Sequence, residues 1–271
     1  MNQHHVLKVR IDDLSDEELD GLLQFWLEAH TGKVIVTPNA ELILMAKKNK
    51  AFLDHLNASD LSLPDSVSLR YAVAALTDES LGHRHPGVAA LERLALLCAG
   101  GGKRLLLLGG EPGVAARAAA ALMGKIPALN AVAIDPGEIS YDGTRVVIEP
   151  SVIREIQRAA PDAVAVALGA PKQEAFLYQA HEQAPEVRIW IAVGGALDML
   201  SGQKRRAPVW MQTVGLEWAW RLLVEPKRAR RILDAAVVFP FTVALSTLCT
   251  HRFLRAVRRV FREVSRQLRG L

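Results

Sequence analysis

The sequence predicts an α/β protein built on a doubly wound, Rossmann-like parallel sheet, followed by a basic, largely helical C-terminal appendage. Three observations predict this fold. Short apolar runs without polar alternation recur through residues 1–203, which is typical of parallel strands covered on both faces. A turn rich in Gly, Pro or Asn and then a helical pattern follow each run. Beyond residue 203 this pattern stops and arginine becomes frequent.

Length and composition favour one principal globular domain. The chain has 271 residues, of which 50% are hydrophobic and 23% charged, and this excludes a disordered chain or a disulfide-stapled mini-protein. Cys98 and Cys249 lie far apart in apolar stretches, which favours buried thiols in a reducing compartment. Residues 1–13 contain no apolar secretory core, so a cytoplasmic location is expected.

Four strand, turn and helix units follow one another in residues 1–203, which we expect to form a catalytic domain. Such units imply right-handed crossovers within one parallel sheet. Strands are expected at residues 33–37, 104–108, 163–168 and 188–193, and helices at residues 40–50, 114–123, 172–183 and 196–200.

The appendage, residues 204–271, differs from this domain in charge. It contains 15 Lys and Arg against 4 Asp and Glu, a balance that attracts phosphate or an anionic surface. An aromatic-rich helix is expected at residues 208–224. Pro240 is expected to break the apolar run 235–249, which is also shorter than the roughly 20 residues that a membrane-spanning helix needs, so a span is disfavoured.

The last segment predicts a basic amphipathic helix that lies on an anionic membrane, so residues 232–271 are expected to bind the membrane surface peripherally. An alternative stays open, in which the apolar face packs on the body and the charged face is solvated. Nucleic acid is not an expected partner, because the arginines alternate with an apolar face and stacking aromatics are scarce. The basic face comprises Arg252, Arg255, Arg258, Arg259, Arg262, Arg266 and Arg269, and the apolar face comprises Phe253, Leu254, Val257, Val260, Phe261, Val264 and Leu268.

Polar residues at the carboxyl ends of the predicted strands are the candidates for chemistry, since ligands bind there in open α/β sheets. Thr37 and Asn39 follow the first strand, where capping of the next helix is the favoured interpretation. Asp65 follows Pro64 and is either a helix N-cap or a general base. Gly109 and Gly110 begin a small-residue turn at which a backbone could approach a phosphate.

The segment Gly169-Ala170-Pro171-Lys172-Gln173-Glu174 is more specific. It brings an amide, a cation and a carboxylate to the start of a helix, directly after a buried strand. This combination suits the recognition of a polar substrate.

Taken together, the motifs resemble the WecG/TagA/CpsF glycosyltransferase family, in the family's order and over residues 33 to about 231. They are Thr37-Pro38-Asn39, Leu63-Pro64-Asp65, Leu108-Gly109-Gly110, Leu168-Gly169-Ala170-Pro171-Lys172-Gln173-Glu174, Gly194-Gly195-Ala196-Leu197-Asp198, Arg206-Ala207-Pro208 and Gly215-Leu216-Glu217-Trp218.

The resemblance implies an inverting transfer, without metal or cofactor, of an N-acetylmannosamine-type sugar. The implied donor is a UDP-sugar, and the acceptor is a polyprenyl-diphosphate-linked sugar in surface polysaccharide or teichoic acid synthesis. By matched position, Asp65 corresponds to the general base. The resemblance implies Thr37, Asn39 and Gln173 as polar residues of the pocket and Arg221, Arg228 and Arg231 as the arginines from the appendage. The turns described above add Gly109, Gly110, Gly169, Pro171, Lys172 and Glu174 to the expected substrate-binding residues.

The chain departs from the family pattern near the proposed base. Ser66-Val67-Ser68 stands where the family has Gly-x-Gly, and Ala89 stands where an acidic residue closes an Arg-x-x-Gly-x-Asp segment. A Gly-Tyr-Phe-like stretch is absent near Pro136. A second interpretation therefore stays open, namely a catalytically weakened relative that binds nucleotide or glycolipid at the membrane. A nicotinamide dehydrogenase is disfavoured, because the dinucleotide fingerprint is missing.

Overall fold

The computed structural model describes residues 2–29, 31–204, 207–208, 211, 217–224 and 229–269, with the side chains of Glu217, Arg221 and Leu268 outside the description. A six-stranded sheet occupies its centre, in the order β4-β3-β10-β9-β5-β6, and every neighbouring pair is parallel. The predicted α/β architecture is confirmed. The six strands are β3 (Lys33–Val36), β4 (Leu61–Ser62), β5 (Arg104–Gly109), β6 (Asn130–Ile134), β9 (Ala163–Ala167) and β10 (Ile189–Ala192).

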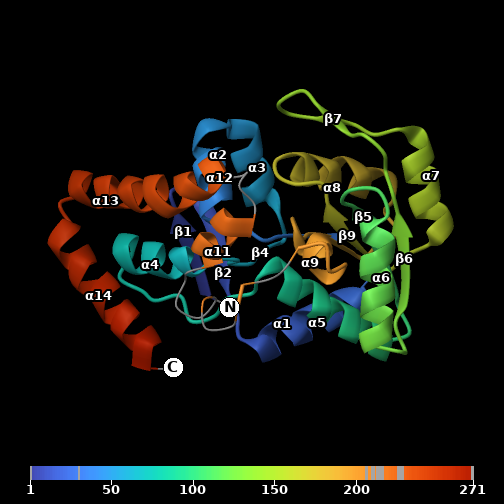
Figure 1. The fold of residues 1–271 in the computed structure, drawn as a ribbon, viewed down its shortest axis with the longest axis horizontal. Helices are drawn as coiled ribbons and strands as arrows, with labels where there is room; N and C mark the ends of the chain where they lie inside the picture. The colour runs from blue at the N-terminus through green and yellow to red at the C-terminus, as the bar shows by residue number, and fades with distance from the viewer. Residues whose placement is uncertain are drawn as a thin grey trace.

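Helices cover both faces of the sheet (Figure 1). One face carries α1 (Asp16–Glu28), α5 (Gly87–Gly100), α6 (Val114–Lys125) and α9 (Ala196–Leu200). The other carries α7 (Pro150–Ala159) and α8 (Lys172–Gln183). Two antiparallel hairpins lie outside the sheet, β1 (Asn2–Val6) with β2 (Val9–Asp13) and β7 (Ser140–Tyr141) with β8 (Val146–Val147).

Strand β5 shows why the apolar runs do not alternate. Leu105 and Leu107 belong to the core under α5 and α6, whereas Leu106 and Leu108 belong to the core under α7 and α8. Side chains on a strand point alternately to opposite faces, so a strand buried on both faces is apolar at every position. All four leucines are fully buried.

A third core lies beside the β4 edge of the sheet and includes residues of the C-terminal helices. It contains the first hairpin, α2 (Ala40–Lys48), α3 (Lys50–Ala58) and α4 (Val67–Leu76), together with Phe239, Val243 and Ala256. The described part of the appendage comprises α11 (Glu217–Val224), α12 (Ala229–Leu233), the π-helical turn η2 (Asp234–Val238), α13 (Phe239–Cys249) and α14 (Phe253–Arg269). The helices of the appendage therefore pack against residues 1–203, the part of the chain that was expected to form the catalytic domain; these residues are called the body below.

The helix expected at residues 40–50 is in fact two helices. Asn49 ends α2 and begins α3, where its side-chain oxygen accepts the backbone N–H of Phe52 at 3.1 Å. An Asn cap stabilises a helix start, and the chain changes direction at that residue. Of the helix expected at residues 208–224, α11 is helical, and most of the rest lies outside the described residues.

The expectation that Pro240 breaks the apolar run was wrong. Residues 229–249 form 21 consecutive helical residues, long and apolar enough to cross a membrane by length and composition alone. Pro240 lies inside this continuous helix and has no N–H to donate; the π-helical turn η2, in which the N–H of Phe239 donates to the carbonyl of Asp234, directly precedes it and accommodates the proline ring. Phe239, Val243 and Thr247 are buried against the body, while Phe241 on the other side is 63% exposed.

Helix α14 presents three faces rather than two. Ala256 and Glu263 are buried, and this face packs on α4. Within the predicted apolar face, Leu254 is 76% and Phe261 72% exposed, whereas Val260 and Val264 are half-buried and Val260 packs against the third core. The arginines that were predicted to share one face lie on a third side. The alternative in which the apolar face packs on the body fits Val260 but not the exposed Leu254 and Phe261. At the end of α13, Cys249 is exposed, contrary to the expectation of a buried thiol, whereas Cys98 is buried.

Candidate active site

Two cavities lie at the carboxyl edge of the sheet, where ligands bind in open α/β folds. The first, called cavity 1, encloses about 350 Å³ and follows strands β3, β4, β9 and β10. The second, called cavity 2, encloses about 940 Å³ and follows β5, β6, β9 and β10. Gly169, Gly194 and Gly195 line both cavities, so the two meet over β9 and β10.

Cavity 1 combines a polar floor with an apolar wall. The floor comes from strand ends and the loop before α5, and the wall comes from the appendage. The polar lining includes Thr37, Asn39, Asp65, Arg84 and Gln173, and the apolar wall includes Trp218, Ile232, Ala235, Ala236 and Pro240. A pocket of this kind suits a ligand with one polar and one apolar part.

Asp65 is not a helix cap, because Ser66 occupies the N-cap position of α4. The half-buried Asp65 carboxylate accepts the backbone N–H of Gly87 at 2.9 Å, and its second oxygen lies 3.5 Å from the side-chain nitrogen of Asn39. These contacts orient the carboxylate in cavity 1. An oriented carboxylate facing a cavity has the geometry of a general base.

The residues after β3 have different tasks. Asn39 caps α2 through its side-chain oxygen, which accepts the N–H of Leu42 at 3.1 Å, so the capping interpretation holds for this residue. Its amide nitrogen is the group directed to Asp65. Thr37 is no cap, because its hydroxyl donates to the carbonyl of Ala192 at 2.9 Å and ties β3 to β10.

Sequence reasoning missed two contributors to the site, Arg84 and Gly87. The guanidinium of Arg84 lines cavity 1 and donates to the carbonyl of Asp65 at 3.3 Å. A Cβ on Gly87 would lie 3.1 Å from the carbonyl oxygen of Val193, so glycine lets this loop approach the sheet closely. The Pro-Gly pair at residues 86–87 is a local turn signal, but its contact with Asp65 is a tertiary one.

Gln173 and Glu174 are adjacent in sequence but differ in environment. Gln173 lines cavity 1, and its side-chain oxygen accepts the N–H of Gly194 at 3.1 Å. Glu174 lies beneath it, is fully buried, and lines neither cavity. Burial raises the pKa of Glu174 to about 7, although the amide of Gln173 donates to it at 2.8 Å.

Cavity 2 is lined mostly by residues of the body. Lys172 contributes an ammonium group that donates to the carbonyl of Ile139 at 2.8 Å. Gly110 also lines it, but its N–H donates to the carbonyl of Ala167 at 2.9 Å and is not free for a phosphate. Gly109 lines neither cavity, and a Cβ there would lie 2.8 Å from the carbonyl oxygen of Ala167. Close strand packing and a positive φ therefore explain this glycine.

The remaining predicted residues divide three ways. Pro171 starts α8 and lines neither cavity. Arg231 lines cavity 1 and forms an ion pair with Glu41 of α2. The backbone of Arg221 belongs to α11, but its side chain and all of Arg228 lie outside the described residues. Among the described residues, no group of three or more His, Cys, Asp or Glu has the arrangement of a metal site.

Comparison with known proteins gives consistent matches. The model of the glycosyl transferase WecG/TagA/CpsF family matches residues 4–252. A Bacillus subtilis (strain 168) protein named N-acetylglucosaminyldiphosphoundecaprenol N-acetyl-beta-D-mannosaminyltransferase is 31% identical over 80% of this chain and 81% of its own length. Staphylococcus aureus proteins of the same name, from strains MRSA252 and NCTC 8325, are 29% identical over 78% of this chain and 79% of theirs.

Proposed function

Because the chain belongs to the WecG/TagA/CpsF glycosyltransferase family, we propose that it transfers an N-acetylmannosamine-type sugar from a UDP-sugar to a polyprenyl-diphosphate-linked acceptor. The names of its relatives describe N-acetylmannosaminyl transfer to an N-acetylglucosaminyl lipid diphosphate. The observation that carries the proposal is the oriented Asp65 carboxylate in a cavity with a polar floor and an apolar wall. The product would enter surface polysaccharide or teichoic acid synthesis.

Asp65 is the proposed general base. It takes the proton from the acceptor hydroxyl as that oxygen bonds to the anomeric carbon of the donor sugar. The bond from the anomeric carbon to the diphosphate oxygen breaks on the opposite face, and UDP leaves with the bonding electron pair. The N–H of Gly87 and the amide of Asn39 keep the carboxylate oriented toward cavity 1 during this step.

Cavity 2 is the proposed site of the donor nucleotide. It is the larger cavity, lies over the centre of the sheet, and contains the ammonium of Lys172 for a diphosphate oxygen. Its other polar side chains include Glu111, Asp135 and Glu138, which suit ribose hydroxyls and base N–H groups. The glycines shared with cavity 1 leave room for the sugar to reach Asp65.

Cavity 1 is the proposed acceptor site. Its apolar wall lies on the same helices whose outer sides expose Val237, Phe241 and Leu245. An isoprenoid chain that enters along this wall would stay in contact with apolar groups while its sugar reaches Asp65. Arg84 and Arg231 line the same cavity and carry the charge needed near a diphosphate.

Residues 232–271 are proposed to hold the protein on the inner face of the cell membrane, in the cytoplasm. The exposed apolar and basic faces of α14 support this placement. One side of α13 is buried against the body, which favours a helix lying at the interface over one surrounded by lipid. Residues 1–203 and 204–271 are then a catalytic domain and an appendage that completes its site.

The test is a panel of UDP-sugars, each incubated with and without polyprenyl-diphosphate N-acetylglucosamine, with released UDP as the readout. We expect UDP release that needs both the acceptor and UDP-N-acetylmannosamine. Binding of the donor without release in any combination would favour the weakened relative instead. Ser66 and Ser68, whose hydroxyls lie 2.8 Å apart in cavity 1, are the departures that this outcome would implicate.

Transfer is also proposed to proceed without a divalent metal, with the ammonium of Lys172 in cavity 2 stabilising the leaving group. Turnover in EDTA should match turnover in added magnesium. A requirement for the metal would overturn this assignment while leaving the proposed transfer intact.

A further inference from the structure

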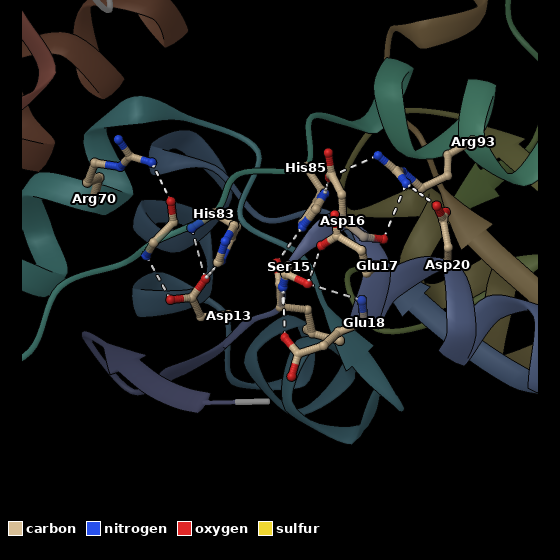
Figure 2. A network of polar contacts seen from close by, with 12 residues as sticks. Asp13, Ser15, Asp16, Glu17, Glu18, Asp20, Arg70, His83, His85 and Arg93 are labelled. Carbon is tan, nitrogen blue, oxygen red and sulfur yellow. Dashed lines mark hydrogen bonds and ion pairs between the residues drawn. The ribbon is translucent and has the colours of Figure 1, made fainter. Parts of the chain in front are cut away.

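The loop between α4 and α5 connects the candidate active site to the first hairpin. Residues 80–86 contain no helix or strand, so individual hydrogen bonds and the burial of Leu81 and His85 fix their position. Figure 2 shows the polar contacts that Asp13 and Arg70 make with this loop.

One side of the loop holds the segment of Asp65. The N–H of His85 donates to the carbonyl of Pro64 at 2.9 Å, and the guanidinium of Arg84 donates to the carbonyl of Asp65. The N–H of Gly87, at the end of the loop, donates to the Asp65 carboxylate itself. The direction of this carboxylate therefore depends on where the loop lies.

The other side of the loop is held by Asp13, the last residue of β2. One Asp13 oxygen accepts the N–H of Gly82 at 2.7 Å, and the other accepts the N–H of His83 at 2.9 Å (Figure 2). The imidazole of His83 lies 3.0 Å from the same oxygen. Next to Asp13, the carbonyl of Leu14 accepts from Nε2 of the buried His85 at 2.9 Å.

Two further features support a specific anchor. Burial would raise the pKa of Asp13, but the N–H donors of Gly82 and His83 outweigh it and hold that pKa below its ordinary value, so the carboxylate is ionised. Arg70 of α4 donates to the carbonyl of Gly82 at 2.8 Å, so both peptide groups of this residue are fixed. Gly82 itself is exposed, so little else fixes it.

We propose that Asp13 is a positioning residue for the transfer, acting through the loop 81–87 on the Asp65 carboxylate. Asp13 lines neither cavity and is not a catalytic residue. Its contribution is to keep Gly87 where its N–H orients Asp65. The inference rests on the proposed function, in which Asp65 is the base.

The first test is Asp13→Asn, since the amide keeps the size of the carboxylate but presents NH₂ to backbone N–H donors. We expect kcat to fall about tenfold with both KM values nearly unchanged, because misorientation of a catalytic group acts on the chemical step. Hydrogen exchange at residues 81–87 should become faster. The matched control is Asp162→Asn, which removes a carboxylate that accepts the N–H of Arg104 at 2.8 Å at the opposite edge of the sheet. It should keep the wild-type kcat.

A gentler variant, Gly82→Ala, tests the same contact if the Asn variant does not fold. Its Cβ would lie 3.3 Å from the nearest Asp13 oxygen, which must then shift by a few tenths of an ångström. We expect a fall in kcat of about two- to fourfold. A wild-type kcat in both folded variants, or an effect on KM alone, would overturn the proposal.

Failure of the proposed function looks different. If the wild-type protein releases no UDP, the proposed function is wrong, but hydrogen exchange still tests whether Asp13 holds the loop 81–87. Unchanged exchange at residues 81–87 in Asp13→Asn would show that Asp13 does not hold the loop.

Discussion

The two cavities share three glycines but are built from different parts of the chain. Residues of the body and Lys204, the first residue of the appendage, line cavity 2, which contains two ammonium groups and several carboxylates. Cavity 1 takes its apolar wall from α11, α12, η2 and α13, and its carboxylate, Asp65, is held by a loop. This difference matches the two ligands of the proposed function, because a nucleotide would bind among the polar groups of cavity 2 and a lipid-linked sugar beside the apolar wall of cavity 1.

The largest effect is expected from Asp65→Asn. Loss of a general base typically costs about 10²–10⁴-fold in turnover, because the acceptor hydroxyl then keeps its proton. UDP binding should remain within about twofold, because Asp65 lines cavity 1 and not cavity 2. Steady-state kinetics and calorimetric titration with UDP measure the two quantities.

Two results would contradict this division between the cavities. Undiminished turnover in the Asn variant would remove Asp65 as the base. A large loss of UDP binding would show that the two cavities do not act separately.

The second prediction concerns the proposed membrane-binding surface of the appendage. Arg255→Glu combined with Arg258→Glu changes two exposed residues on the basic face of α14. Each cation near an anionic surface contributes on the order of 1 kcal/mol, so vesicle binding should weaken about thirtyfold or more. Co-sedimentation with phosphatidylglycerol vesicles measures it, and UDP binding should not change.

The matched control lies at the far end of the molecule. Arg154→Glu combined with Arg158→Glu reverses two exposed charges on α7, which lies opposite α14 in Figure 1. Equal loss of vesicle binding in both double variants would mean that overall charge, not α14, holds the protein on the membrane.

The third prediction tests cavity 2. Lys172→Met keeps the aliphatic stem but removes the charge and the hydrogen bond to Ile139. A charge-assisted hydrogen bond is worth about 1.5–3 kcal/mol, so the KM for the UDP-sugar should rise at least about tenfold. The KM for the acceptor should stay the same. A rise in the acceptor KM alone would exchange the roles assigned to the two cavities.

The parts of this site that were predictable from sequence follow from local chemistry. A buried run ending in a polar turn places Asn39, Asp65 and Gln173 at one edge of the sheet, whatever the details of packing. Strands β5 and β9 were predicted nearly to their ends, because both faces of each are buried.

Other parts depend on contacts between distant residues. Asn39 contacts the Asp65 carboxylate from 26 positions away in the sequence, and Gly87 contacts it from 22 positions away. No local sequence pattern reveals either contact. Gly109 suggested a turn that binds phosphate, whereas glycine is needed there because a Cβ would clash with the carbonyl oxygen of Ala167. Pro240 suggested a break, yet the π-helical turn before it lets the helix continue past a residue that lacks an N–H.

The smallest effect on turnover is expected from Glu174→Gln, which asks whether the buried neighbour of Gln173 belongs to the site. Because burial raises the pKa of Glu174 from 4.5 to about 7, the folded state holds this proton more tightly than the unfolded state. Stability therefore falls as the pH rises from about 4.5 to about 7, by about 3 kcal/mol in total. Gln is neutral throughout and accepts the same hydrogen bond from Gln173, so the variant should lack this fall. At pH 8 its free energy of unfolding should exceed that of the wild type by about 3 kcal/mol in urea denaturation, and at pH 4 the two should agree. Turnover at pH 8 should stay within about twofold, because Glu174 lines neither cavity. The opposite result is a variant that is this stable and still loses as much turnover as Asp65→Asn. That result would show that the Glu174 carboxylate takes part in the reaction, although it does not line cavity 1.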